Sequence, residues 1–198
     1  MKQTGYPFQY VGSNTIGADK YLQETHIYAF QSDKSGHRYQ VHMEQYVNHL
    51  YCIKFFDVTV DIRTGKFSHL TGTYEPRTIF HTVAEIALDI YRKDSKASFF
   101  FVGSADTRDR PGVKTRRYNV YVSFVNDLGI DHLFEAHLVD AYSMCVLLNR
   151  RAVPDMDAYM QQILDFIAEL HHSHRTFSRF ISAETSPDGS AVSVLSQQ

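Results

Sequence analysis

The residues best suited to chemistry lie in one stretch, "SFFFVGSADTRDRPGVKTRRYNVYV", which spans residues 98–122. Arginine binds phosphate or carboxylate through a planar fork of N–H donors that stays charged at every physiological pH. Two apolar runs flank the loop, so its charged side chains are expected to face outward. The loop therefore predicts a site for an anion. Five basic residues fall within ten positions of it: Arg108, Arg110, Lys114, Arg116 and Arg117.

The strand that enters this loop ends in Gly-Ser, a pair that can offer backbone amides and a hydroxyl to an anion. The stretch is not a P-loop, because G-x-x-x-x-G-K-[ST] is absent. A solvated loop whose arginines pair with Asp106 and Asp109 accounts for the same residues, and that alternative stays open. The residues predicted to contact a nucleic acid or a nucleotide are Gly103, Ser104, Arg108, Arg110, Lys114, Arg116, Arg117 and Tyr118.

No motif identifies a reaction, so whether the chain is an enzyme stays open. Asp57 and Asp61 alternate with apolar residues and can share the wet face of a strand, where a nuclease could use them to hold a metal. Edge-strand solubility explains the two acids equally well. His81, on the polar face of a helix, can act as a general base assisted by the loop arginines. The histidines in "HHSHR", residues 171–175, suit a helix end, and neither a metal nor another cofactor is predicted.

The elements around these residues follow from hydrophobic periodicity. The stretch 26–46 alternates around the turn "SDKSG" and predicts a hairpin, and residues 50–62 and 67–70 predict two more strands of an antiparallel meander. After Pro76 the period changes to that of a helix, whose apolar stripe is Ile79, Val83, Ile86, Ala87 and Ile90.

The second half of the chain is expected to complete the sheet. Residues 97–103 predict an apolar strand that pairs with residues 118–125 across the basic loop. Residues 132–149 fit a hairpin or a helix, and both alternatives stay open. An amphipathic helix is expected from Asp155 to about residue 172.

These elements predict an α+β fold, a twisted antiparallel sheet packed against two main helices. A single domain is expected over residues 1–181, with an irregular segment at 1–20 and a flexible tail at 182–198.

Composition narrows the class of protein. Of the 198 residues 43% are hydrophobic, which suffices for a core, and the net charge of −2 excludes a generally basic nucleic-acid binder. Cys52 and Cys145 lie in apolar runs and are expected to be buried, reduced thiols. No apolar run approaches the about 20 residues that cross a bilayer, so no membrane partner is expected. The sequence predicts a cytoplasmic protein.

The segment "IFHTVAEIALDIYRKDSKASFFFVGSADTRDR" resembles the core of a family of small, uncharacterised bacterial proteins of the Bacteroidetes type. The shared features are a helix with Thr82, Val83 and Ala84, a strand entering Gly-Ser, and the R-x-R pair Arg108 and Arg110. The likeness covers about residues 26–125 and departs at the longer link "PGVKTRR". This resemblance implies a bacterial source and an α+β fold, and it brings no known activity.

The sequence favours a binding module that engages a phosphate-rich partner, a nucleic acid or a nucleotide, through the loop 103–118. Two alternatives stay open. One is a protein-interaction component of a bacterial defence or toxin–antitoxin-like system. The other is a nuclease-like enzyme that uses His81 or the pair Asp57 and Asp61. A protein partner or a homodimer is a further expectation, because the apolar stripe of the last helix can exceed what the sheet covers.

Overall fold

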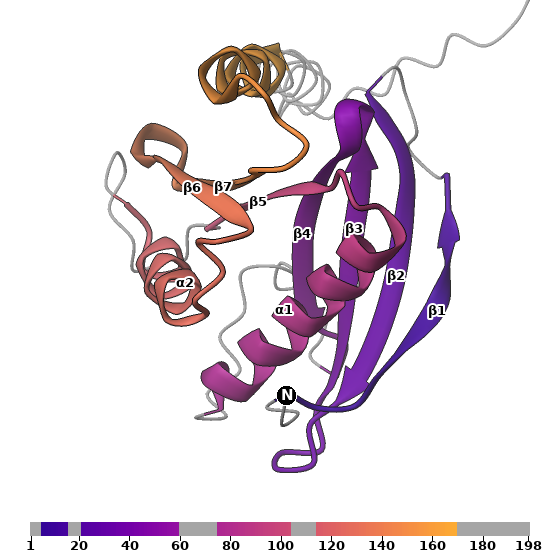
Figure 1. Cartoon of the computed structure of the whole chain (residues 1–198). Coiled ribbons are helices and arrows are strands. Elements are labelled where there is room, and N and C mark those ends of the chain that lie inside the picture. Colours follow the sequence, from indigo (N-terminus) through magenta and orange to yellow (C-terminus); the bar gives the residue numbers. More distant parts are fainter. Residues whose placement is uncertain (1–4, 16–20, 60–74, 104–113, 170–198) are drawn as a thin grey trace, which may run out of the picture. The chain divides into compact units, whose positions relative to one another are not determined.

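The computed structural model describes residues 5–15, 21–59, 75–103 and 114–169. The chain divides into two compact units, Met1–Pro154 and Asp155–Gln198, and each is described by itself. The first unit contains a seven-stranded, mostly antiparallel sheet of order β1-β2-β3-β4-β5-β7-β6 (Figure 1), so the predicted α+β class is confirmed. Its elements are β1 (Phe8–Asn14), β2 (Leu22–Gln31), β3 (Arg38–Tyr46), β4 (Leu50–Asp57), α1 (Pro76–Lys93), β5 (Ser98–Val102), α2 (Arg116–Asp127), β6 (Phe134–Val139) and β7 (Met144–Asn149).

The meander β2-β3-β4 forms as the alternating pattern predicts. Tyr39, Val41 and Met43 of β3 are almost fully buried, and they face the same side of the sheet as Phe55 and Ile53 of β4. The strand predicted at residues 50–62 ends earlier than expected, because β4 ends at Asp57. Residues 60–62 lie outside the described residues. The strand expected at 67–70 lies outside the described residues.

The prediction of an irregular segment at residues 1–20 is wrong for Phe8–Asn14, which form β1 and pair with β2. Gly12 has a φ of 149°, and the pairing register shifts between Tyr10 and Gly12. A bulge of this kind takes up an extra residue on an edge strand. Gly12 therefore lies at an irregularity within β1.

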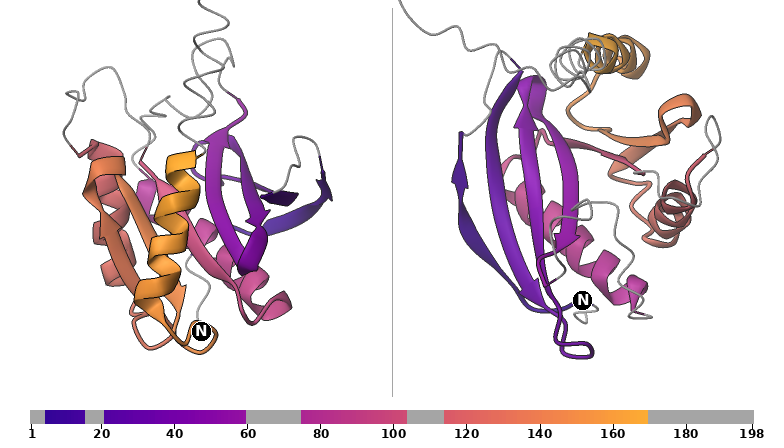
Figure 2. Two further views of the ribbon diagram at one scale, coloured as in Figure 1. Left: turned by 90° about the horizontal axis from the view of Figure 1, so that it is seen from above. Right: turned by 180° about the vertical axis from the view of Figure 1, so that it is seen from behind.

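Helix α1 forms where the period changes. Its buried residues Ile79, Val83, Ile86 and Ile90 belong to the predicted stripe. Figure 2 shows the helix lying along one face of the strands β2–β4. Pro76 occupies the first turn, where the missing N–H costs nothing.

Strand β5 enters the sheet parallel to β4, at the end of the crossover through α1. The next strand of the sheet is β7, which β6 flanks in an antiparallel hairpin. Residues 134–149 therefore form the hairpin, and the helical alternative for this part of the chain is excluded. Cys145 and Leu147 of β7 are buried in the core.

The predicted strand at 118–125 is wrong, because residues 116–127 form α2 (Figure 1). Thr115 caps this helix by accepting a hydrogen bond from the backbone N–H of Tyr118. Tyr118, Tyr121 and Val125 follow at intervals of three and four and pack against the core. The basic loop therefore connects a strand to a helix and is not a hairpin loop.

The second unit contains a helix over residues 156–169 within the described range. Asp155 accepts a hydrogen bond from the N–H of Ala158, the bond of an N-terminal cap. The predicted start of the last helix is confirmed. The expected tail at 182–198 lies outside the described residues. Among the helices described, none has the length and apolar character needed to span a membrane.

Candidate functional site

The sheet opens where β4 and β5 separate. These two strands pair only over Leu50 to Cys52 and Ser98 to Phe100. Beyond that point Ile53 and Phe55 of β4 leave Phe101 of β5 without a strand neighbour on that side. Helices α1 and α2 cover the opening, and a groove of about 540 Å³ remains between the helices and the sheet. This volume is within the range of small-molecule pockets.

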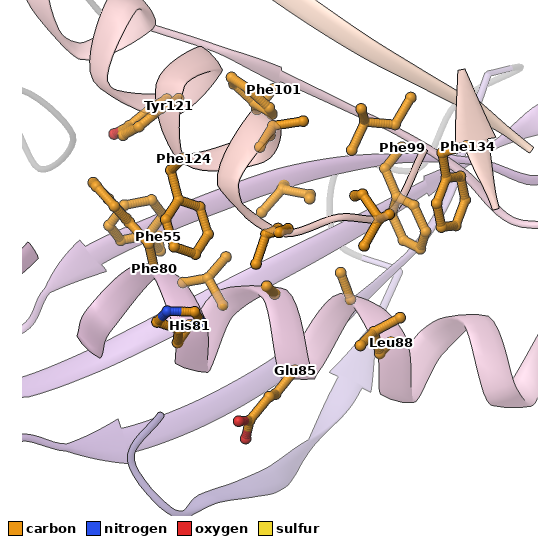
Figure 3. Close-up of a pocket in the computed structure, with 18 of the residues that line it drawn as sticks. Phe55, Phe80, His81, Glu85, Leu88, Phe99, Phe101, Tyr121, Phe124 and Phe134 are labelled. Carbon is orange, nitrogen blue, oxygen red and sulfur yellow. The ribbon is translucent and has the colours of Figure 1, made fainter. Parts of the chain in front are cut away.

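Aromatic rings form one end of the groove (Figure 3). Phe80 of α1 contacts Phe55 of β4, with 5.9 Å between ring centroids, and Tyr121 of α2, with 5.2 Å. Phe124 of α2 lies 5.4 Å from Phe80. Phe101 of β5 adds an edge-to-face contact with Tyr121 at 5.4 Å. The elements β4, α1, β5 and α2 thus all contribute rings to one apolar wall.

The groove is long in the direction of α1. The residues of α1 that line it run from Phe80 to Arg92, and at 1.5 Å rise per residue they span about 18 Å. Phe99 and Phe134 lie at the end of the groove away from Phe55 (Figure 3), with 5.7 Å between their ring centroids. Small and aliphatic side chains complete the lining: Ile53, Val83, Ala84, Ala87, Leu88, Val125 and Leu147.

Polar groups border the groove without filling it. The ring of His81 packs edge-on against Phe124 at 5.0 Å. The carboxylate of Glu85 points away from the aromatic wall (Figure 3) and accepts a hydrogen bond from the N–H of Gly5 at 3.3 Å. Burial raises the pKa of Tyr121, whose hydroxyl is therefore neutral at physiological pH. The groove is suited to an apolar ligand with at most a polar end.

Gly103 of the predicted anion site has a structural role. Its N–H donates to the carbonyl of Ser143 at 2.9 Å, and its carbonyl accepts from the hydroxyl of Thr115 at 2.8 Å. A Cβ at this position would lie 2.6 Å from the backbone N of Tyr118. The glycine thus allows the end of β5 to touch the first turn of α2, and its amide is not available to an anion.

Two other described residues of the predicted site, Lys114 and Tyr118, contact one carboxylate of this protein. Lys114 pairs with Asp140 at 2.8 Å, and the buried hydroxyl of Tyr118 donates to the same carboxylate at 2.9 Å. Burial and then that hydrogen bond raise the pKa of Tyr118 to about 12. Arg116 is exposed, whereas its neighbour Arg117 is only 9% exposed. Ser104, Arg108 and Arg110 lie outside the described residues.

Asp57 is not on a wet strand face, which corrects the prediction for this acid. Its carboxylate accepts a hydrogen bond from Nδ1 of His37 and another from the N–H of Thr59 at 2.8 Å. Burial alone would raise the pKa of Asp57, but these bonds outweigh it and hold the pKa below its ordinary value. Asp61, the proposed second ligand, lies outside the described residues. Within the described ranges, no group of three metal-binding side chains occurs.

A second polar cluster surrounds Glu75, the residue before α1. Its carboxylate accepts hydrogen bonds from the hydroxyls of Ser32 and Ser35, each at 2.6 Å, and from the hydroxyl of Tyr6. Glu75 occupies the N-cap position of α1, but its side chain makes no capping bond and instead ties the turn between β2 and β3 to α1. The hydrogen bonds of this cluster therefore stabilise the fold by connecting the β2–β3 turn to the start of α1.

Both cysteines are buried and free, as predicted. Burial raises the pKa of each thiol to about 12. Neither thiol can therefore act as a nucleophile at physiological pH.

Comparisons with known proteins do not assign the chain to a class of protein. No protein-family description, no curated protein and no solved structure matches the chain. The resemblance to the Bacteroidetes-type family stays a prediction.

Sequence reasoning missed the groove. The clue is the high aromatic content, 13 tyrosines and 14 phenylalanines. Phe80 stands beside the predicted stripe of α1, and Phe124 stands in a segment predicted as strand. An apolar residue next to a complete stripe can indicate a second contact surface on a helix.

Proposed function

We propose that the protein binds an apolar small molecule in the groove between the sheet, α1 and α2. The observation that carries the proposal is a cavity of about 540 Å³ with an aromatic wall. Protein cores pack at the density of organic crystals and leave few voids larger than a water molecule. A groove of this size with an apolar lining is therefore the default binding site.

The energetics favour an apolar occupant. Each CH₂ group moved from water into such a lining contributes about 0.8 kcal/mol. Rings that enter the groove can also meet Phe80, Tyr121 and Phe124 edge to face, which adds about 1 kcal/mol for a well-placed pair. A charged group in the middle of the groove would lose hydration without a partner, because Glu85 points away.

A neutral fluorescent probe tests the proposal. N-phenyl-1-naphthylamine is expected to bind the wild-type protein with a saturable rise in fluorescence. Ala84→Phe and Ala87→Phe place a ring in the middle of the groove and are expected to abolish that rise. Thermal unfolding of each variant shows whether the fold is kept, and filling a void is expected to leave the melting temperature unchanged or higher.

The matched control is Ala136→Phe, the same exchange on an exposed position of β6. It is expected to bind the probe like the wild type. Equal fluorescence from all four proteins would place the probe elsewhere and contradict the proposal. So would a wild-type protein that gives no saturable signal.

The earlier hypotheses stay predictions. A phosphate-rich partner would now depend on Arg108, Arg110 and Arg116, because Arg117 is buried and Lys114 is paired. The test compares oligonucleotide binding at ~50 mM salt by the wild type and by the triple arginine-to-alanine variant, since phosphate contacts give a salt-dependent affinity. Equal and negligible binding by both would exclude it. The interaction-component and nuclease-like alternatives gain no support from the described residues.

A further inference from the structure

One end of the groove carries a guanidinium, that of Arg92. Arg92, an exposed residue in the last turn of α1, lines the groove. Its charge helps to lower the pKa of Asp89, but within the described ranges it forms no direct hydrogen bond or ion pair. The acid three positions before it, Asp89, is already engaged. Its carboxylate pairs with Lys93 at 2.7 Å and accepts a hydrogen bond from the hydroxyl of Tyr28 at 2.8 Å.

Lys54, the other basic residue in the lining, pairs with Glu44 at 2.7 Å. Arg92 is charged at every physiological pH and matches a carboxylate through two parallel hydrogen bonds. A ligand that leaves a single anionic group at the Arg92 end would satisfy it.

The shape of the groove selects the remainder of the ligand. The lining along α1 extends about 18 Å, with aliphatic side chains along the helix and rings at both ends of the groove. A narrow chain without polar groups fits such a lining. A compact ligand would leave one end of the groove unfilled.

We propose that the ligand is a long-chain carboxylic acid whose carboxylate binds Arg92 and whose hydrocarbon chain lies along α1 toward Phe80. This inference rests on the proposed apolar binding function and adds the head group and its direction. The chain supplies affinity in proportion to its buried length, and Arg92 supplies the discrimination between head groups. Arg92 is thus the specificity-determining residue.

Ligands with the same chain and different head groups provide the test. Dodecanoate, 1-dodecanol and dodecylamine are each used to displace N-phenyl-1-naphthylamine from the wild-type protein. Dodecanoate is expected to bind about tenfold more tightly than dodecanol, the effect of one charge-assisted hydrogen bond. Dodecylamine is expected to bind most weakly, because its ammonium group meets a like charge. In the series octanoate, decanoate and dodecanoate, affinity is expected to rise about fourfold for each added CH₂.

Arg92→Gln removes the charge and leaves a shorter, neutral polar side chain. It is expected to lose the preference for dodecanoate over dodecanol while it binds dodecanol like the wild type. The matched control is Arg77→Gln, an exposed arginine of the same helix that does not line the groove, and it is expected to keep the preference.

The outcomes separate this inference from the function on which it rests. Dodecanol that displaces the probe as well as dodecanoate does, from both the wild type and Arg92→Gln, would overturn the head-group assignment and leave the apolar site standing. Tighter binding of dodecylamine would overturn it as well. Failure of every compound to displace a probe that does bind the wild type would overturn the ligand class. A probe that does not bind at all would overturn the proposed function itself.

Discussion

Phe55 of β4 and Phe80 of α1 meet edge to face, with 5.9 Å between their ring centroids, at the point where β4 has left β5. The contact packs the strands β2–β4 against α1 near the place where β4 and β5 separate. Tyr121 of α2 touches both rings, with centroid distances of 5.9 Å to Phe55 and 5.2 Å to Phe80. The three rings therefore act both as core and as the wall of the groove.

Phe80→Ala is expected to destabilise the protein by about 2 kcal/mol, less than the ~3–5 kcal/mol of a fully buried phenylalanine because Phe80 is half-buried. Dodecanol at a concentration near 100 times its dissociation constant is expected to restore up to about 2.7 kcal/mol, since a ligand of the native state alone stabilises by mass action. Urea unfolding with and without dodecanol measures both effects. A variant as stable as the wild type would mean that Phe80 is not part of the wall.

Asp57→Asn is expected to lower the free energy of unfolding by about 2 kcal/mol at pH 7, because the bond from His37 is charge-assisted. The pKa of Asp57 is lower in the folded protein, so its contribution is present above its unfolded pKa of about 3.9 and disappears as the pH falls through the folded value. Urea unfolding at pH 7 and at about pH 2 should show the wild type losing its advantage over the variant. Asp131→Asn, at an exposed position, serves as the control and is expected to change stability little at either pH. A gap that persists undiminished in acid would contradict the linkage.

Gly103→Ala is expected to cost about 2 kcal/mol, because the new methyl group would overlap the hydroxyl of Thr115 and the backbone N of Tyr118, both at 2.6 Å. Gly129→Ala is the control for backbone strain alone, because its φ is +63° but nothing lies within contact distance. Its cost is expected to be about 1 kcal/mol. Chemical denaturation of the wild type and of both variants measures the two losses in free energy of unfolding. A harmless Gly103→Ala would mean that β5 and α2 do not approach closely.

The thiols of Cys52 and Cys145 are expected to react slowly with Ellman's reagent in the native protein and at once in guanidinium chloride. Burial raises the pKa of both to about 12, so almost no thiolate is present at pH 8. The two variants Cys52→Ser and Cys145→Ser assign any residual rate. A fast native reaction at either residue would show that its surroundings open to solvent.

The sequence predicted the meander and α1 well, because period 2 and period 3.6 are both unambiguous there. It failed for α2, since "YNVYVSFV" alternates like a strand and also carries Tyr118, Tyr121, Val122 and Val125 at helical spacing. Thr115 favours the helix over a strand here, because its hydroxyl caps the first turn and donates to the carbonyl of Gly103. That second bond joins residues 12 apart and has no local signature.

The candidate site was beyond local sequence patterns. The lining comes from β4, α1, β5, α2 and the β6–β7 hairpin, and these meet only after β4 and β5 separate. Arg92 reads as an ordinary basic residue in the last turn of a helix. Its place at the end of an apolar groove depends on the tertiary structure.

A single tryptophan in the groove tests the central claim most directly, because the natural chain has none. Phe124→Trp would place an indole in the aromatic wall, and Val120→Trp would place one on an exposed position of the same helix. On titration with dodecanol, the account predicts a saturable change in tryptophan emission from Phe124→Trp and none from Val120→Trp. Equal responses from the two variants, or no response from Phe124→Trp in a protein that keeps its cooperative unfolding, would contradict an apolar binding site at this place.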